Sequence, residues 1–164
     1  MTDQSRTAAF EEFARARTAH LLRSAWLLCG SRTEAEDLVQ ETLVKVYVRM
    51  HRMLAAKLDN PAAYAQTTLT RTFVSSRRKR SSTEQPYADL PDDAVSDHAD
   101  ASTLRVDLAE ALAEASPTDR AVLVLRYLDD LSVEEVADIL GLSPGAVRNR
   151  SMRALARMRE RSLR

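Results

Sequence analysis

The stretch from Leu131 to Arg159 constrains the fold of this chain most, because its spacing fits two short helices joined by a tight turn. Ser132 can cap the first helix together with Glu135, in a capping-box pair three residues apart. Gly141 follows the last apolar residue of that helix and can adopt the positive φ that ends it. Ser143 is then placed as the cap of a second helix that opens with proline. The pattern predicts a helix-turn-helix.

The second helix of this motif has an apolar stripe on one side and basic residues on the other. The stripe consists of Val147, Ser151, Ala154, Leu155 and Met158. The outward face carries Arg148, Asn149, Met152 and Arg153. Seven arginines and one acid lie between positions 144 and 164. Such a face suits the major groove of DNA, with a solvated basic helix on a bundle as the alternative.

Composition favours an all-α protein, because the 164 residues include few aromatic residues and only three glycines. The formal net charge is zero, but basic residues cluster at 71–80 and 148–164 while acids lie elsewhere. The single cysteine, Cys29, lies in an apolar run and is interpreted as a small buried hydrophobe. With no apolar leader and no stretch long enough to span a membrane, we expect a cytoplasmic protein without membrane insertion.

Three helices are expected in the first half of the chain. The first covers residues 7–29, and Gly30 is placed to end it. The second starts with a capping-box pattern at Thr33 and runs to about residue 53. The third starts near Pro61 and continues to residue 80.

The third of these helices ends in a cluster of positive charge. Five basic residues and no acid lie between positions 71 and 80, namely Arg71, Arg77, Arg78, Lys79 and Arg80. This composition favours contact with a phosphate backbone, with a solvated helix end as the alternative. Phe73 is interpreted as a core residue, because it continues the helical stripe of Ala65 and Leu69.

Residues 81–101 change in character, with six acids, two prolines and no lysine or arginine. They predict a linker that is either a passive tether or a segment lying in a positively charged channel. Helical periodicity then resumes, with one helix ending near Ala115 and another capped by Ser116 ahead of the helix-turn-helix. The predicted architecture is therefore two small helical modules, at 7–80 and 102–164, joined by an acidic linker.

Motifs for catalysis or metal binding are missing from the sequence. It contains no Gly-rich phosphate loop, no HExxH and no CxxC spacing, and its three histidines are scattered over unlike segments. We therefore expect no enzyme activity, no cofactor and no metal. Two basic modules on one tether indicate a protein that contacts two separated patches of DNA at once.

Three segments resemble the sigma-70 family of RNA polymerase subunits. Glu36-Asp37-Leu38-Val39-Gln40-Glu41 resembles the family's core-polymerase-binding motif, and NPAAYAQTTLTRTFVSSRRKR resembles its helix that reads the −10 element. Residues 116–159 are similar to its C-terminal module. The order of these segments, without the extra regions of housekeeping members, resembles the extracytoplasmic-function (ECF, group IV) subgroup in its short actinobacterial form.

The resemblance implies an all-α promoter-specificity subunit that binds core RNA polymerase, directs it to promoter DNA and helps to open it. The residues that would dock on polymerase are Asp37, Leu38, Gln40 and Glu41. Those that would contact the −10 element are Arg71, Arg77, Arg78, Lys79 and Arg80. Those that would face bases of the −35 element are Arg148, Asn149, Met152 and Arg153, with Arg150 and Arg157 nearer phosphates.

The same resemblance points to an anti-sigma factor as a further partner, without identifying one, and to a nucleoid location when the chain is bound to polymerase. The alternative function is a helix-turn-helix repressor or activator that is not a polymerase subunit. Such a regulator needs neither the polymerase-binding motif at residues 36–41 nor the acidic linker.

Overall fold

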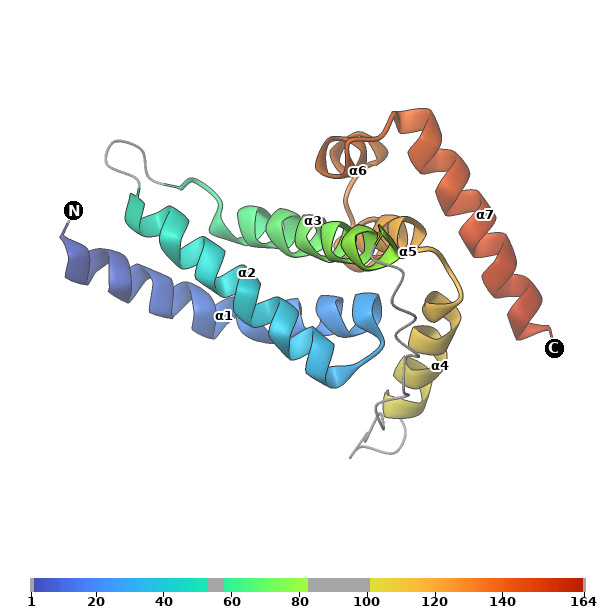
Figure 1. Ribbon diagram of the computed structural model, residues 1–164, viewed down its shortest axis with the longest axis horizontal. Helices are drawn as coiled ribbons and strands as arrows, with labels where there is room; N and C mark the ends of the chain where they lie inside the picture. The colour runs from blue at the N-terminus through green and yellow to red at the C-terminus, as the bar shows by residue number, and fades with distance from the viewer. Residues whose placement is uncertain (1, 53–57, 83–100, 164) are drawn as a thin grey trace.

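The computed structural model describes residues 2–52, 58–82 and 101–163, and within these ranges the chain forms helices and no strand (Figure 1). The helices are α1 (Asp3–Cys29), α2 (Arg32–Arg52), α3 (Pro61–Ser82), α4 (Ala101–Ala113), α5 (Pro117–Leu123), the π-helical turn η1 (Val124–Leu128), α6 (Val133–Leu140) and α7 (Pro144–Ser162). The predicted all-α fold is confirmed. Most of the predicted linker, residues 83–100, lies outside the described residues. None of the described helices is long and apolar enough to span a membrane.

Helices α1, α2 and α3 pack into a bundle. The first residues of α1 and α2 differ slightly from those that the sequence predicts. α1 begins at Asp3, earlier than expected, because the Thr2 hydroxyl accepts a hydrogen bond from the backbone N–H of Ser5. The cap predicted at Thr33 is wrong. α2 already begins at Arg32, because the hydroxyl of Ser31 accepts from the backbone N–H of Glu34. The bundle core includes Leu21, Leu28, Val39 and Val46, together with Leu69 and Phe73, which lie on the predicted stripe of the third helix.

The helix-turn-helix forms as the sequence predicts. Both hydrogen bonds of the capping box between Ser132 and Glu135 are present. Gly141 has φ +66°, which an L side chain rarely adopts, so it ends α6 and starts the turn. The Ser143 hydroxyl caps α7 by accepting from the backbone N–H of Ala146 at 3.1 Å.

The helix ahead of this motif does not stay α-helical to its end. From Val124 to Leu128 it widens into the π-turn η1, and the Asp129 N–H reaches back to the Val124 carbonyl. The extra residue in the turn rotates the following side chains. Leu128 follows the buried Leu125 by three residues, a spacing that predicts an inward side chain, but it is 37% exposed.

The two halves of the chain pack against each other. Figure 1 shows α5 beside α3 and α6 above it, with α4 near the end of α1. Ala121 and Val124 are buried in the same core cluster as the residues of α1, α2 and α3. Leu27 of α1 packs in turn against the core formed between α4, α5 and α7. The two predicted modules are therefore docked through α4, α5 and η1.

Candidate nucleic-acid and protein interfaces

The outward face of α7 is open to solvent. All four predicted base-facing residues have exposed side chains, namely Arg148, Asn149, Met152 and Arg153. Of the two residues predicted to lie nearer phosphates, Arg157 is exposed. Met152 is 69% exposed. The Arg148 guanidinium lies 3.6 Å from the carboxylate of Glu134, and both groups are exposed, so water and salt screen this pair strongly. The helix is held from the other side by the buried Val147, Ser151 and Ala154.

Arg150 differs from its neighbours on α7. Its Nη1 donates to Asp119 Oδ1 at 2.8 Å, and the Asp119 side chain is only 9% exposed. Because this pair is shielded from water, it anchors α7 to the start of α5. Arg150 therefore holds α7 against the start of α5, and its contact with a phosphate stays a prediction.

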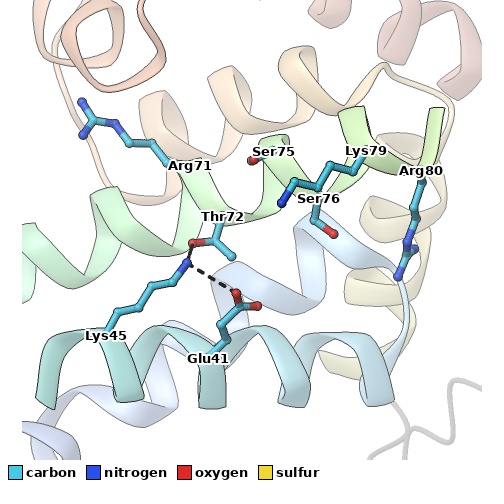
Figure 2. Close-up of a pocket in the computed structure, with 8 residues that line it drawn as sticks. All are labelled: Glu41, Lys45, Arg71, Thr72, Ser75, Ser76, Lys79 and Arg80. Carbon is cyan, nitrogen blue, oxygen red and sulfur yellow. Dashed lines mark hydrogen bonds and ion pairs between the residues drawn. The ribbon is translucent and has the colours of Figure 1, made fainter. Parts of the chain in front are cut away.

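A polar groove of about 530 Å³ lies between α2 and α3 (Figure 2). Its lining consists of Glu41, Lys45, Arg71, Thr72, Ser75, Ser76, Lys79 and Arg80. Four of these side chains are basic and one is acidic. Lys45 Nζ donates to Thr72 Oγ1 at 3.0 Å and lies 3.4 Å from Glu41 Oε1, which joins the two helices across the groove. The groove brings together three of the predicted −10 residues, and Arg78 is exposed outside its lining.

Arg77 does not belong to that surface, so its assignment as a DNA contact is not supported by its position. Its side chain is 15% exposed, and Nη2 lies 2.9 Å from Glu34 Oε2 and 3.4 Å from the Cys29 carbonyl. Its guanidinium lies 5.3 Å from the centre of the Phe73 ring. The sequence carried a signal for this, because Arg77 follows Phe73 by four residues and continues the inward stripe. Arg80 also pairs with this carboxylate, with Nη1 3.0 Å from Glu34 Oε1, but the Arg80 side chain is more exposed than that of Arg77.

Arg71 lines the groove but is engaged by the other half of the chain. Its Nε donates to the Ile139 carbonyl at 2.8 Å and its Nη2 to the Asp138 carbonyl at 3.3 Å. Both carbonyls lie in the last turn of α6, where carbonyls lack helical partners and attract cations.

The outward face of α2 carries three of the four predicted polymerase contacts. Asp37, Gln40 and Glu41 are exposed. Leu38 is not available, because it is 7% exposed and packs in the bundle core; it follows Ala35 by three residues and so falls on the inward side.

Sequence reasoning missed three exposed apolar residues on the same helix, namely Val44, Tyr47 and Val48. Val44 is 61% exposed. The signal was present in the sequence, since these residues lie off the inward stripe of Val39, Thr42 and Val46. Tyr47 is held in place by an edge-on contact with Phe10, with ring centres 5.2 Å apart, and by stacking on His51. An exposed, ordered apolar row beside carboxylates is typical of a protein-binding surface.

Burial raises the pKa of the Cys29 thiol from 9.0 to about 11, opposed by the nearby charge of Arg77. Only the thiolate reacts with alkylating agents. At pH 8 we therefore expect iodoacetamide to modify Cys29 about a hundredfold more slowly in the folded protein than in urea. Mass spectrometry of quenched samples measures both rates. Equal rates would show that the thiol is not buried.

Comparisons with known proteins agree with this geometry. The family model of Sigma-70 region 2 matches residues 10–83, and that of Sigma-70, region 4 matches residues 105–158. The chain is 38% identical over 151 residues to the RNA polymerase sigma-E factor of Streptomyces avermitilis, covering 92% of this chain and 83% of that protein. It is 30% identical over 159 residues to the ECF RNA polymerase sigma factor SigL of Mycobacterium tuberculosis, covering 93% and 85%. The chain belongs to the ECF sigma factors of the sigma-70 family.

A solved structure shares the fold of this sigma factor. The sigma factor RpoE of Bartonella quintana, in complex with the anti-sigma factor NepR, superposes with a TM-score of 0.69 and 27% identity over 93% of this chain and 95% of that one. The match covers both halves. Helices α1, α2 and α3 accordingly form region 2, and α4, α5, α6 and α7 lie in region 4. The resemblance inferred from the sequence is confirmed.

Sigma factors are not catalytic enzymes, and their regions act by binding. Among the described residues, no group of three or more His, Cys, Asp or Glu side chains is arranged to hold a metal ion. The surfaces described above are therefore interpreted as contacts for macromolecules.

Proposed function

We propose that this sigma factor binds core RNA polymerase through α2, contacts the −10 element through the groove between α2 and α3, and reads the −35 element with α7. The observation that carries the proposal is the joint presence, in one chain, of an exposed recognition face on a helix-turn-helix and an exposed acidic and apolar face on α2. A stand-alone repressor needs the first face only. The chain contributes no catalytic step and acts in the cytoplasm, on the nucleoid when bound to polymerase.

The recognition face supports direct readout of a duplex. An α-helix fits the major groove, where arginine pairs with guanine and asparagine with adenine through two hydrogen bonds each. Arg148, Asn149 and Arg153 lie at the exposed N-terminal half of α7, which is the part of a recognition helix that enters the groove. The exposed Met152 can contact a thymine methyl group.

The groove between α2 and α3 suits a single strand. Lys45, Lys79 and Arg80 supply charge for phosphates, and the hydroxyls of Ser75 and Ser76 supply donors and acceptors for bases or sugars. Arg71 belongs to the same lining. Replacing Arg71 with Ala is therefore expected to weaken contact with the −10 strand.

We also propose an anti-sigma factor as a partner. The Bartonella quintana relative was solved with one, and its likeness to this chain covers both regions.

Run-off transcription with reconstituted holoenzyme tests the proposed function. Core polymerase alone should give no transcript from promoters selected out of a random library, and addition of this chain should give transcripts of defined start. Tight sequence-specific binding to duplex DNA without polymerase, with no transcript, would favour the repressor.

Replacing Arg153 with Ala tests the readout by α7. If Arg153 pairs with a guanine, the substitution should cost about 1–3 kcal/mol at one −35 position and little at the others. Transcription from a set of promoters with single changes in the −35 element measures this. Arg157→Ala is the matched control, because removing a phosphate-binding side chain should weaken all promoters equally. A uniform loss for Arg153→Ala would reassign it to the backbone.

A further inference from the structure

One carboxylate lies among the basic side chains that line the groove between α2 and α3, and it belongs to Glu41. Glu41 is also exposed on the face of α2 that we assign to polymerase. The same side chain therefore lies on two proposed surfaces. A carboxylate beside the path of a nucleic-acid strand repels the phosphates of that strand, because both carry negative charge.

Lys45 connects this carboxylate to the opposite wall of the groove. Its Nζ lies 3.4 Å from Glu41 Oε1, one helical turn earlier on α2, and donates to Thr72 Oγ1 of α3 at 3.0 Å (Figure 2). A lysine ammonium group has three donors and no acceptor. Glu41 and Thr72 engage it from two sides, so little of its charge is left for a phosphate in the groove.

The pair of Glu41 and Lys45 is easy to break. The side chain of Glu41 is 57% exposed and that of Lys45 is 46% exposed. Exposed ion pairs four residues apart on a helix contribute little to stability, because water competes for both groups. A partner that brings a cation to Glu41 can therefore take the carboxylate. Lys45 would then keep only a neutral hydroxyl as its partner in the groove.

We propose that Glu41 couples the polymerase surface to the −10 groove. In the free chain its carboxylate holds Lys45 and screens the ammonium charge from the strand. A basic group of polymerase that binds Glu41 releases Lys45 to a phosphate of the −10 strand. Glu41 is thus a positioning residue for the strand contact, and the coupling rests on the proposed function of the two surfaces. Only side chains change partners, so neither helix has to move.

The variant Glu41→Gln tests the coupling, because it keeps the shape of the side chain and removes its charge. Binding of the full free chain to a fluorescent single strand, carrying the −10 sequence of a selected promoter, measures the effect. We expect the variant to bind about fivefold more tightly than the unaltered chain. The plot of log affinity against log salt should steepen by about 0.7, the value for one more phosphate contact on a single strand. Helical circular dichroism should not change, because the position is exposed.

Glu36→Gln is the matched control. It removes the same charge from the same helix, and its carboxylate also pairs one turn away, with Glu36 Oε1 3.1 Å from Arg32 Nε. Glu36 does not line the groove. Its affinity for the strand should therefore stay within about twofold of the unaltered chain. An equal gain in both variants would show that net charge alone sets the affinity, and the coupling would be overturned.

Lys45→Gln identifies the group that gains the phosphate. In a chain that already carries this change, Glu41→Gln should alter strand affinity by less than about twofold, because no ammonium group remains to be released. A full gain in the absence of Lys45 would show that the carboxylate acts on the strand directly. The proposed release would then be wrong.

Saturating core polymerase tests the link to the partner. In holoenzyme, the unaltered chain and Glu41→Gln should bind the strand within about twofold of each other, because polymerase already engages the carboxylate. A fivefold difference that persists in holoenzyme would overturn the coupling. Unaltered holoenzyme that gives no promoter-specific transcript overturns the proposed function instead. Normal transcription, with no gain in the free Glu41→Gln chain, overturns the coupling alone.

Discussion

The double variant Asp37→Arg, Val44→Arg is expected to lose at least a hundredfold in affinity for core polymerase while keeping its fold. The two positions are seven residues apart on the outward face of α2, and both are exposed. Exposed substitutions usually change stability by less than about 0.5 kcal/mol. At an interface, by contrast, a like charge facing a partner's charge costs several kcal/mol. Arginine at position 44 also removes apolar surface from the interface.

Glu12→Arg, Ala19→Arg is the matched control for this variant. Its positions are also seven residues apart and exposed, but they lie on α1. It adds similar charge to a surface to which we assign no partner, so its affinity should stay within about twofold of the unaltered chain. Binding of fluorescently labelled protein to core polymerase, with thermal melts as a check on folding, measures both. Unchanged affinity in the α2 variant would remove α2 from the polymerase interface.

The local elements of this fold could be predicted from the sequence because each carries its own signal. The capping box at Ser132, the positive φ of Gly141 and the cap at Ser143 depend on residues within a few positions of each other. The π-turn η1 could not be predicted in that way. Its residues have ordinary helical character, and its wider turn accompanies the hydrogen bond that Asp129 makes with His20, 109 positions away.

The sequence predicted which faces of the helices are exposed better than it predicted which individual residues lie on those faces. Periodicity placed the exposed side of α7 correctly, because α7 packs along a single stripe. Leu38 was assigned to the polymerase contacts from the family motif, and Arg77 to the DNA contacts from the run of basic residues, so periodicity decided neither. Each of them lies three or four residues from a buried position and packs inward. The docking of the two regions left no periodic trace, because it uses small residues and single polar contacts from distant segments.

Replacing Phe73 with Ala is expected to have the largest effect on stability, because the ring is shared by both regions. It is 2% exposed, and the guanidinium groups of Arg77 and Arg120 lie 5.3 and 5.4 Å from its centre. A buried Phe→Ala change costs about 3–5 kcal/mol, because apolar packing is removed and a cavity is left behind. Removing each cation–π interaction adds about 0.5–2 kcal/mol to this cost. Urea denaturation followed by circular dichroism measures the total.

Leu69→Ala separates the role of the ring from that of the core. Leu69 is fully buried one turn earlier on α3, and the change should cost about 2–5 kcal/mol. It leaves the Phe73 ring against Arg120, so scattering from the Leu69→Ala chain should stay compact under native conditions. Phe73→Ala removes the ring on which Arg120 rests, and its regions should separate below the denaturant concentration that unfolds region 2. Equal expansion in both variants would show that the aromatic ring holds region 4 no better than any other part of the core.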